Sequence, residues 1–310
     1  MCISDDPITQ AYKQYLAELF EAGLLIPSGV DGVYGRSGVF EDIIERFERY
    51  VTKMGEHLNP EVMRFPPVMA REQYQRTDHL ATFPNLLGSV HSFMGKERDH
   101  IDLMNKKEDG EDWASCCLSA TDVVLAPAAC YALYPTAKGI LPEQGRIIDL
   151  TSFVFRHEPS IDPARMQSFR MREYVRLGTP AQALEHRDYW LQRGEEMLNA
   201  VGLAVNRVVA NDPFFGRGGR VMAATQREQH LKYELEIPIA TGDKPTAIFS
   251  ANYHMDHFSK TFAIDGHDGD VAHTACVGFG LERIALALFK THGFEPKNWP
   301  EDVRKVLELC

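Results

Sequence analysis

Two runs of alternating side chains, separated by a turn-rich stretch, constrain the fold of this chain more than any other feature. Residues 155–158 (FRHE) and 169–177 (FRMREYVRL) alternate with the period of two that is typical of β-strands. The stretch between them contains two prolines, a serine and an aspartate, which favour turns. We therefore predict a β-hairpin with a long polar loop. The two strands of this hairpin carry charged residues at positions where a strand that faces the core would carry apolar ones.

Charged and aromatic side chains share one face of this predicted hairpin. Because strand side chains alternate between faces, Arg156 and Glu158 lie on one face of the first strand, and Phe169 and Glu173 on one face of the second. If both sets point to the same side, one surface combines a guanidinium, two carboxylates and an aromatic ring. The pattern alone leaves open whether this surface is a binding site or a solvated face with surface ion pairs.

The rest of the chain predicts an α+β fold. Further β-like runs cover residues 146–158, 232–239 and 246–253, and helical patterns begin at Thr179 and within residues 278–289. Several strands follow one another without a helix between them. This order favours an antiparallel β-sheet flanked by helices rather than a parallel sheet with crossover helices.

The first 59 residues carry two helical patterns. Asp6 and Pro7 can cap and open the first helix, and a second amphipathic pattern runs from Phe40 to Met54. A glycine-rich break at residues 28–38 separates them. We expect an N-terminal helical segment over residues 1–59, followed by the main domain over residues 60–310.

Composition narrows the function classes. The net charge of −11 argues against a broad nucleic-acid surface, although the segment from Arg217 to Lys232 is a candidate local basic patch. No apolar run is long enough for a membrane span and no secretory signal opens the chain, so a cytoplasmic location is expected. The six cysteines form no C-x-x-C pair, and a disulfide framework is not expected.

The stretch GFGLERIALAL, from Gly278, is a second candidate for chemistry. It contains G-x-G but lacks the third glycine of a dinucleotide-binding fingerprint. Arg283 falls in the first turn of the predicted helix, where the helix dipole favours anions rather than cations. An anionic ligand close to Arg283 would explain this placement; the alternative is simply a tight start to a packed helix.

Together these two stretches resemble a known family. F-R-x-E at 155–158 and G-x-G-L-E-R at 278–283 are similar to motifs 2 and 3 of class II aminoacyl-tRNA synthetases. The resemblance runs from about residue 60 to the C-terminus. It is strongest to the atypical, zinc-dependent seryl-tRNA synthetases and to their truncated homologues, the amino acid:[carrier protein] ligases.

The resemblance implies an ATP site on the hairpin. Arg156 would bind the α-phosphate, Arg283 the γ-phosphate, and Glu158 the adenine amino group, while Phe169 would stack on adenine. Loop residues would cover the nucleotide, and two strand ends would close the pocket. The implied ATP-binding set is Arg156, Glu158, Arg165, Met166, Phe169, Lys232, Ala247, Ser250 and Arg283.

The resemblance also implies a zinc site at Cys130, Glu173 and Cys276, which spacing alone does not connect. Three protein ligands leave one tetrahedral position open, and in the family the amino group of the substrate takes it. Asn252 begins a polar run that includes His254, Asp256, His257 and Lys260; contact with the substrate and a solvated loop are equally open for this run. Cys116 and Cys117 match no part of the pattern and are expected to be buried thiols.

The implied activity is a two-step ligation. A small amino acid, glycine or alanine, would be activated with ATP and Mg²⁺ to aminoacyl-AMP and then transferred to the phosphopantetheine thiol of a carrier protein. The helical tRNA-binding arm of seryl enzymes is absent, so no tRNA partner is expected. Alternatives are a tRNA-charging enzyme, a ligase for a free small amine or thiol, and a catalytically silent regulatory paralogue.

Two parts of the family pattern are weak in this sequence. The glutamate that usually helps to hold Mg²⁺ is not evident in residues 244–254, and Glu236 or Asp256 could replace it. Motif 1, through which the family forms homodimers, fits best at residues 64–71 (RFPPVMAR). A homodimer is therefore expected from the resemblance alone.

Overall fold

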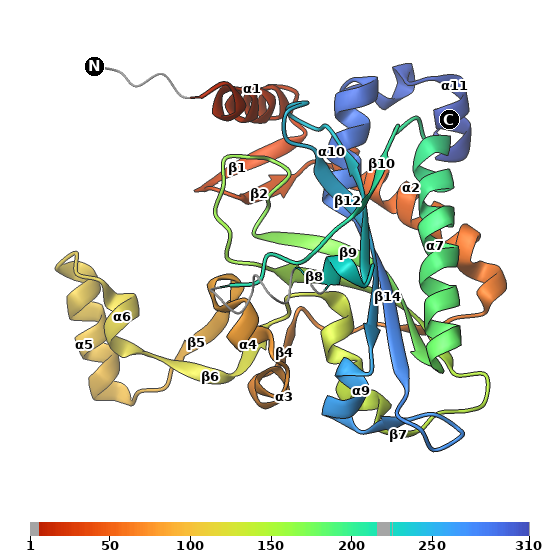
Figure 1. Cartoon of the computed structure of the whole chain (residues 1–310). Coiled ribbons are helices and arrows are strands. Elements are labelled where there is room, and N and C mark those ends of the chain that lie inside the picture. The colour runs from red at the N-terminus through yellow and green to blue at the C-terminus, as the bar shows by residue number, and fades with distance from the viewer. Residues whose placement is uncertain (1–5, 216–223, 225, 310) are drawn as a thin grey trace.

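A seven-stranded sheet forms the centre of the computed structural model, which describes residues 6–215, 224 and 226–309 (Figure 1). The strand order is β10-β11-β12-β14-β9-β8-β3, and every neighbouring pair is antiparallel except β3 with β8. The strands are β3 (Glu61–Met63), β8 (Arg146–Phe155), β9 (Ser168–Gly178), β10 (Asn206–Val209), β11 (Lys232–Ile237), β12 (Thr246–Met255) and β14 (His273–Gly280). The predicted α+β fold is confirmed.

Most of the described helices lie around this sheet, and α5 and α6 lie on a projection described below. The described α-helices are α1 (Pro7–Glu21), α2 (Gly38–Gly55), α3 (Arg71–Arg76), α4 (His79–Thr82), α5 (Glu97–Glu108), α6 (Trp113–Cys117), α7 (Pro180–Ala200), α9 (His257–Phe262), α10 (Leu281–His292) and α11 (Glu301–Val306). No helix in the described part of the chain combines the length and apolar character that crossing a membrane requires.

The predicted hairpin is present as β8 and β9, joined by the loop at residues 156–167. The two strands pair residue for residue from Arg146 opposite Leu177 to Phe155 opposite Ser168. Val154 stands opposite Phe169 and is buried, so these two side chains lie on the same face. Of the two predicted sets, Arg156, Phe169 and Glu173 point to this side, whereas Glu158 does not.

The two faces of the sheet have different roles. Phe249, Val277 and Phe279 point into the main hydrophobic core, where Trp190 of α7 and Leu286 of α10 pack against them. Their neighbours along the strands alternate to the opposite face, which carries the polar residues described below. Helix α7 begins where the sequence predicts: Thr179 and Gln182 form a reciprocal capping box at its start.

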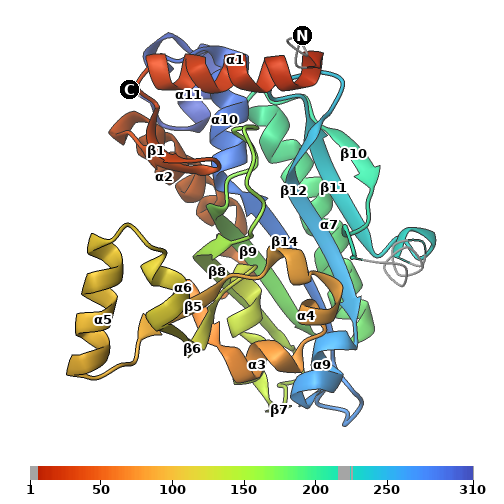
Figure 2. The ribbon, with the colours of Figure 1, turned by 90° about the vertical axis from the view of Figure 1, so that its left-hand side faces the viewer.

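The N-terminal residues pack on the same core. Helix α1 starts at Pro7 with Asp6 as its cap, as predicted. The Tyr15 hydroxyl donates a hydrogen bond of 2.6 Å to the Leu286 carbonyl, and the Phe40 ring of α2 lies 5.6 Å from that of Phe289 in α10. Figure 2 shows α1 and α2 beside α10.

The glycine-rich break at residues 28–38 is mostly ordered structure, which the sequence did not indicate. It contributes to the hairpin of β1 (Leu25–Val30) and β2 (Val33–Arg36). The tip of this hairpin holds the loop 156–167: the Gly32 carbonyl accepts from the Gln167 amide at 2.7 Å, and the Asp31 carbonyl accepts from the Gln167 side chain at 2.8 Å. Gly32 has a positive φ of 75°, which glycine adopts without strain.

A second sheet projects from the body. It consists of β4 (Val68–Ala70), β6 (Leu118–Leu125) and β5 (Ser89–Phe93), and it carries α5 and α6 at its end (Figures 1 and 2). No residue of α5 is buried. The sequence patterns did not predict this projection.

Candidate active site

A cavity of about 530 Å³ lies over the polar face of the main sheet. Strands β9, β11, β12 and β14 form its floor, and the short 3₁₀ turn Ala129–Ala132, α4 and α9 stand around it. All but three of the predicted site residues line it. These are Cys130, Arg156, Phe169, Glu173, Lys232, Ala247, Ser250, Asn252, Cys276 and Arg283.

Strand register explains why residues so far apart in the sequence meet here. Residues directly opposite each other on antiparallel strands point to the same face. One row across the sheet runs from Lys232 through Asn252 to Cys276. The next row runs from Glu234 through Ser250 and Gly278 to Glu173.

The G-x-G of residues 278–280 clears the cavity floor. A methyl group on Gly278 would lie 3.2 Å from the end of the Met171 side chain and 3.6 Å from both Glu173 Cγ and Ser250 Oγ. Gly278 and Gly280 both line the cavity and belong to β14. These glycines therefore keep the middle of the site open, which is a different use from a dinucleotide-binding turn.

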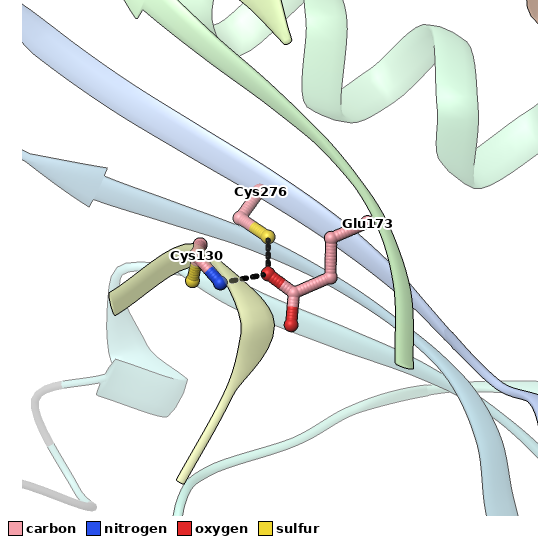
Figure 3. Close-up of side chains that lie close together, drawn as sticks. All are labelled: Cys130, Glu173 and Cys276. Atoms are coloured by element: carbon pink, nitrogen blue, oxygen red, sulfur yellow. Dashed lines mark hydrogen bonds between the residues drawn. The ribbon is translucent and has the colours of Figure 1, made fainter. Parts of the chain in front are cut away.

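Cys130, Glu173 and Cys276 form one buried cluster (Figure 3). Their ligand atoms all lie within 4.8 Å of one another. Glu173 is 0% exposed; its carboxylate accepts from the backbone N–H groups of Ala129 and Cys130, both at 3.0 Å, and from the Cys276 thiol at 3.2 Å. The turn at Ala129–Ala132 thus fixes the orientation of the carboxylate.

The chemistry of this cluster suits a metal cation. The hydrogen bond with Cys130, burial and the Glu173 carboxylate raise the pKa of the Cys276 thiol well above its usual value. At Cys130 the hydrogen bond with Cys276 acts to lower the pKa, but burial and Glu173 raise it more. No lysine or arginine of the described chain forms an ion pair with Glu173. Two thiols and a carboxylate that no described cation pairs with are a donor set that fits Zn²⁺.

Two arginines stand free of carboxylates elsewhere in the cavity. Arg156 donates to the Pro127 carbonyl at 3.0 Å, and its guanidinium lies 5.5 Å from the centre of the Phe169 ring. Arg283 donates to the carbonyls of Ala164 and Ala247 at 2.8 and 2.9 Å. Neither guanidinium forms an ion pair with any described carboxylate.

The charge of Arg283 is costly in this position. Burial, followed by repulsion from Arg156 and Arg165, lowers its pKa to about 10. A pair of uncompensated guanidinium groups is the arrangement expected at an anion site, where a bound phosphate restores neutrality. The sequence placed Arg283 in the first turn of its helix, and α10 does begin at Leu281.

Glu158, Arg165 and Met166 do not line the cavity. Arg165 pairs with Glu158 at 2.6 Å, and the Glu158 side chain is 45% exposed. Met166 is buried in the main core. The loop that carries them follows the β1–β2 hairpin instead of folding over the cavity, so the ATP contacts predicted for these three residues stay predictions.

Asp212 and Glu234, which the sequence patterns missed, line the cavity beside Lys232. Lys232 is buried and pairs with Asp212 and, at 3.0 Å, with Glu234. It does not belong to a surface basic patch; Arg217 and Arg220 of that patch lie outside the described residues. Glu234 lines the cavity, whereas Glu236 and Asp256 do not.

The predicted polar run divides between two structures. Asn252 and His254 belong to β12 and line the cavity, as does His257 at the start of α9. Asp256 and Lys260 pair with each other at 2.8 Å and do not line it. This run is therefore the end of a strand and a helix start rather than a loop.

Cys117 is not part of this cluster. Cys117 is partly exposed rather than buried as predicted, because α6 lies on the projecting sheet instead of the core. The side chain of Cys116, together with Cys2 and Cys310, lies outside the described residues.

Solved structures identify the class of fold. The chain superimposes on the M. kandleri seryl-tRNA synthetase, solved with A. aeolicus tRNASec, with a TM-score of 0.79 and 20% identity, over 95% of this chain and 60% of that one. The Pyrococcus horikoshii seryl-tRNA synthetase, solved with ATP, gives a TM-score of 0.69 and 14% identity over 95% of this chain and 62% of that one. The fold is that of a class II aminoacyl-tRNA synthetase catalytic domain.

Sequence relatives then identify the family. Amino acid–[acyl-carrier-protein] ligases 1 and 2 of Bradyrhizobium diazoefficiens are each 44% identical to this chain, over 91% of it and over 86% and 84% of their own lengths. A type-2 serine–tRNA ligase of Methanopyrus kandleri is 27% identical over 58% of this chain and 37% of its own. No family model matches the chain. The chain belongs to the amino acid–[acyl-carrier-protein] ligase family.

Proposed function

We propose that the protein activates a small amino acid, glycine or alanine, with ATP and transfers it to the phosphopantetheine thiol of a carrier protein. The observation that carries this proposal is one cavity with two chemically different ends. A buried Cys130–Glu173–Cys276 cluster suits a metal and an amine, and Arg156 and Arg283 suit phosphates. Family membership supports the ligase activity and the carrier partner.

In the first step the carboxylate of the amino acid attacks the α-phosphate of ATP, and pyrophosphate leaves. A carboxylate is already ionised at neutral pH, so the chain needs to supply position and positive charge rather than a base. Arg156 would hold the α-phosphate and Arg283 the γ-phosphate. Phe169, beside Arg156, would stack on the adenine ring.

At the other end, Cys130, Glu173 and Cys276 would hold Zn²⁺. When bound, this ion would supply a Lewis acid for the amino group of the substrate and so select amino acids over hydroxy acids. Gly278 leaves the space between this end and the arginines open, and Asn252 stands next to Cys276 across the strands. A small amino acid would bridge this space.

We propose Glu234 as the carboxylate that helps to hold Mg²⁺. It lines the cavity directly opposite Ser250, whereas Glu236 and Asp256 lie elsewhere.

We further propose a homodimer that works in the cytoplasm. Strand β3 stands at the edge of the main sheet with Val62 64% exposed, which supports a partner at this edge.

Pyrophosphate exchange tests the first step. The enzyme should exchange labelled pyrophosphate into ATP with glycine or alanine, and should then load a pantetheinylated carrier but not tRNA. Cys276→Ser should lose bound zinc and exchange activity, while Cys117→Ser should keep both. Loading of tRNA alone would favour the tRNA-charging alternative, and absence of exchange with every small amino acid would favour a silent paralogue.

A further inference from the structure

A hydrogen-bonded histidine–aspartate pair stands at the edge of the cavity. His257 Nε2 lies 3.2 Å from Asp78 Oδ1, and both residues line the cavity. Their side chains remain 44% and 43% exposed, so a group that enters from solvent can reach them. Neither residue has a role in the activation step proposed above.

Neighbouring residues connect the pair to both ends of the site. His257 packs against Phe258, with 5.0 Å between ring centres, and Phe258 lies 5.6 Å from Tyr131, the neighbour of Cys130. On the other side, Asp78 is followed along the chain by His79. The charge of Arg156 is close enough to His79 to help lower the pKa of His79. In an aminoacyl-adenylate held by the cluster and Arg156, the carbonyl carbon lies between these same ends.

The three histidines that the described chain contributes to the cavity differ in basicity. Burial lowers the pKa of His79 to about 4 and that of His254 to about 3, which makes both weak bases. The hydrogen bond to Asp78 raises the pKa of His257 above its usual value, and Asp256 adds to this effect, although burial opposes it. His254 faces His257 from β12 and is uncharged at neutral pH. Only His257 is matched to proton transfer near pH 7.

We propose that His257, oriented by Asp78, accepts the proton of the attacking thiol in the transfer step; this inference rests on the proposed function. With Nε2–H donated to Asp78, Nδ1 is the free base, and no hydrogen bond from a described residue occupies it. The sulfur–hydrogen bond breaks and the proton moves to Nδ1. The sulfur forms a bond to the carbonyl carbon, the carbon–oxygen bond to AMP breaks, and AMP leaves with that electron pair.

The expected effect depends on pH. About 3% of a thiol with a pKa of 8.5 is ionised at pH 7, so loss of the base should slow transfer about 30-fold at that pH. In His257→Gln the transfer rate should rise about tenfold per pH unit and approach the wild-type rate near pH 9. In Asp78→Asn the acidic limb of the pH profile should move to lower pH, because His257 loses the partner that raises its pKa.

The experiment measures single-turnover transfer of a labelled amino acid from enzyme-bound aminoacyl-AMP to free pantetheine, beside pyrophosphate exchange. Transfer by His257→Gln should fall at least tenfold more than exchange, and imidazole should restore transfer by His257→Ala. His267→Gln, an exposed histidine outside the cavity, is the matched control and should match wild type in both assays.

Failure of this inference and failure of the proposed transfer function give different results. If wild type loads pantetheine and His257→Gln loads it equally fast at pH 7, or loses exchange and transfer to the same extent, His257 is not the proton acceptor. If wild type exchanges pyrophosphate but loads no thiol, the transfer function fails and this inference falls with it.

Discussion

Replacing Arg283 by methionine should leave the ligand-free protein at least as stable as wild type. This is unusual for a largely buried arginine that makes two hydrogen bonds, to the carbonyls of Ala164 and Ala247. The reason is its charge: burial, followed by repulsion from Arg156, lowers its pKa to about 10. The folded protein therefore carries this cation at a cost.

The magnitude follows from that shift. A lowering of this size corresponds to roughly 3 kcal/mol. Because the cavity is open to water and ions, we reduce this to about 1–2 kcal/mol. Loss of the two hydrogen bonds costs about 1 kcal/mol, since water in the cavity can replace them. The net change in the free energy of unfolding of Arg283→Met should lie between zero and about 1 kcal/mol of added stability.

Arg172→Met is the matched comparison, because Arg172 is a buried arginine with a partner. Its guanidinium binds Asp149 at 2.7 and 2.6 Å, and both side chains are almost fully buried. The same substitution there leaves the Asp149 carboxylate buried beside only Arg64, at 3.7 Å, and should cost about 3 kcal/mol.

Urea unfolding of zinc-loaded protein without ATP, followed by circular dichroism, measures both changes. Addition of ATP and Mg²⁺ should then stabilise wild type and Arg172→Met but not Arg283→Met, and pyrophosphate exchange by Arg283→Met should fall about 10³-fold or more. The reasoning is refuted if Arg283→Met unfolds more easily than wild type by as much as Arg172→Met does.

Three further changes have defined outcomes. Chelation of the metal should lower the melting temperature of wild type but not that of Cys276→Ser, as thermal unfolding with and without chelator would show. Gly278→Ala should raise the KM for the amino acid, measured by pyrophosphate exchange, because the added methyl group would enter the cavity floor. Gly280→Ala should change this KM less, because its methyl group would lie 3.6 Å from the nearest atom, the Ile248 carbonyl oxygen. Glu41→Gln should lose about 1 kcal/mol of stability at pH 7. Burial acts to raise the pKa of Glu41, but Arg170 lowers it more, so this stability is present above pH 4.5 and is lost as the pH falls through the lowered pKa. The variant and wild type should converge in urea unfolding once the pH is below that pKa.

The sequence predicted those strands and helices whose residue patterns match the surfaces on which they pack. Strand β9 alternates because Tyr174 packs in the main core while Phe169, Met171 and Glu173 line the cavity on the other face, and α7 carries its own capping box. Strand β14 was not predicted. Alanine and glycine are depleted in strands generally, and β14 contains Ala275, Gly278 and Gly280. The two glycines keep the cavity floor clear.

The site was predictable only in part. Residues within the two motifs could be placed from their order, and the cysteine–glutamate cluster could be placed only through the family resemblance. Asp78 and Asp212 reach the cavity from segments without any local pattern, so no spacing connects them to Arg156. Met166 packs in the core, where an apolar side chain on a loop gains stability, and its predicted contact with ATP stays a prediction.

The β1–β2 hairpin affects how this protein can be shortened. A fragment that begins at residue 60 keeps every side chain that lines the cavity. It also loses the carbonyls of Asp31 and Gly32 that tether Gln167, and it strips α1 and α2 from the surface of α10. Such a truncated protein would release one end of the strand that carries Phe169 and Glu173, and we expect it to aggregate through the uncovered helix.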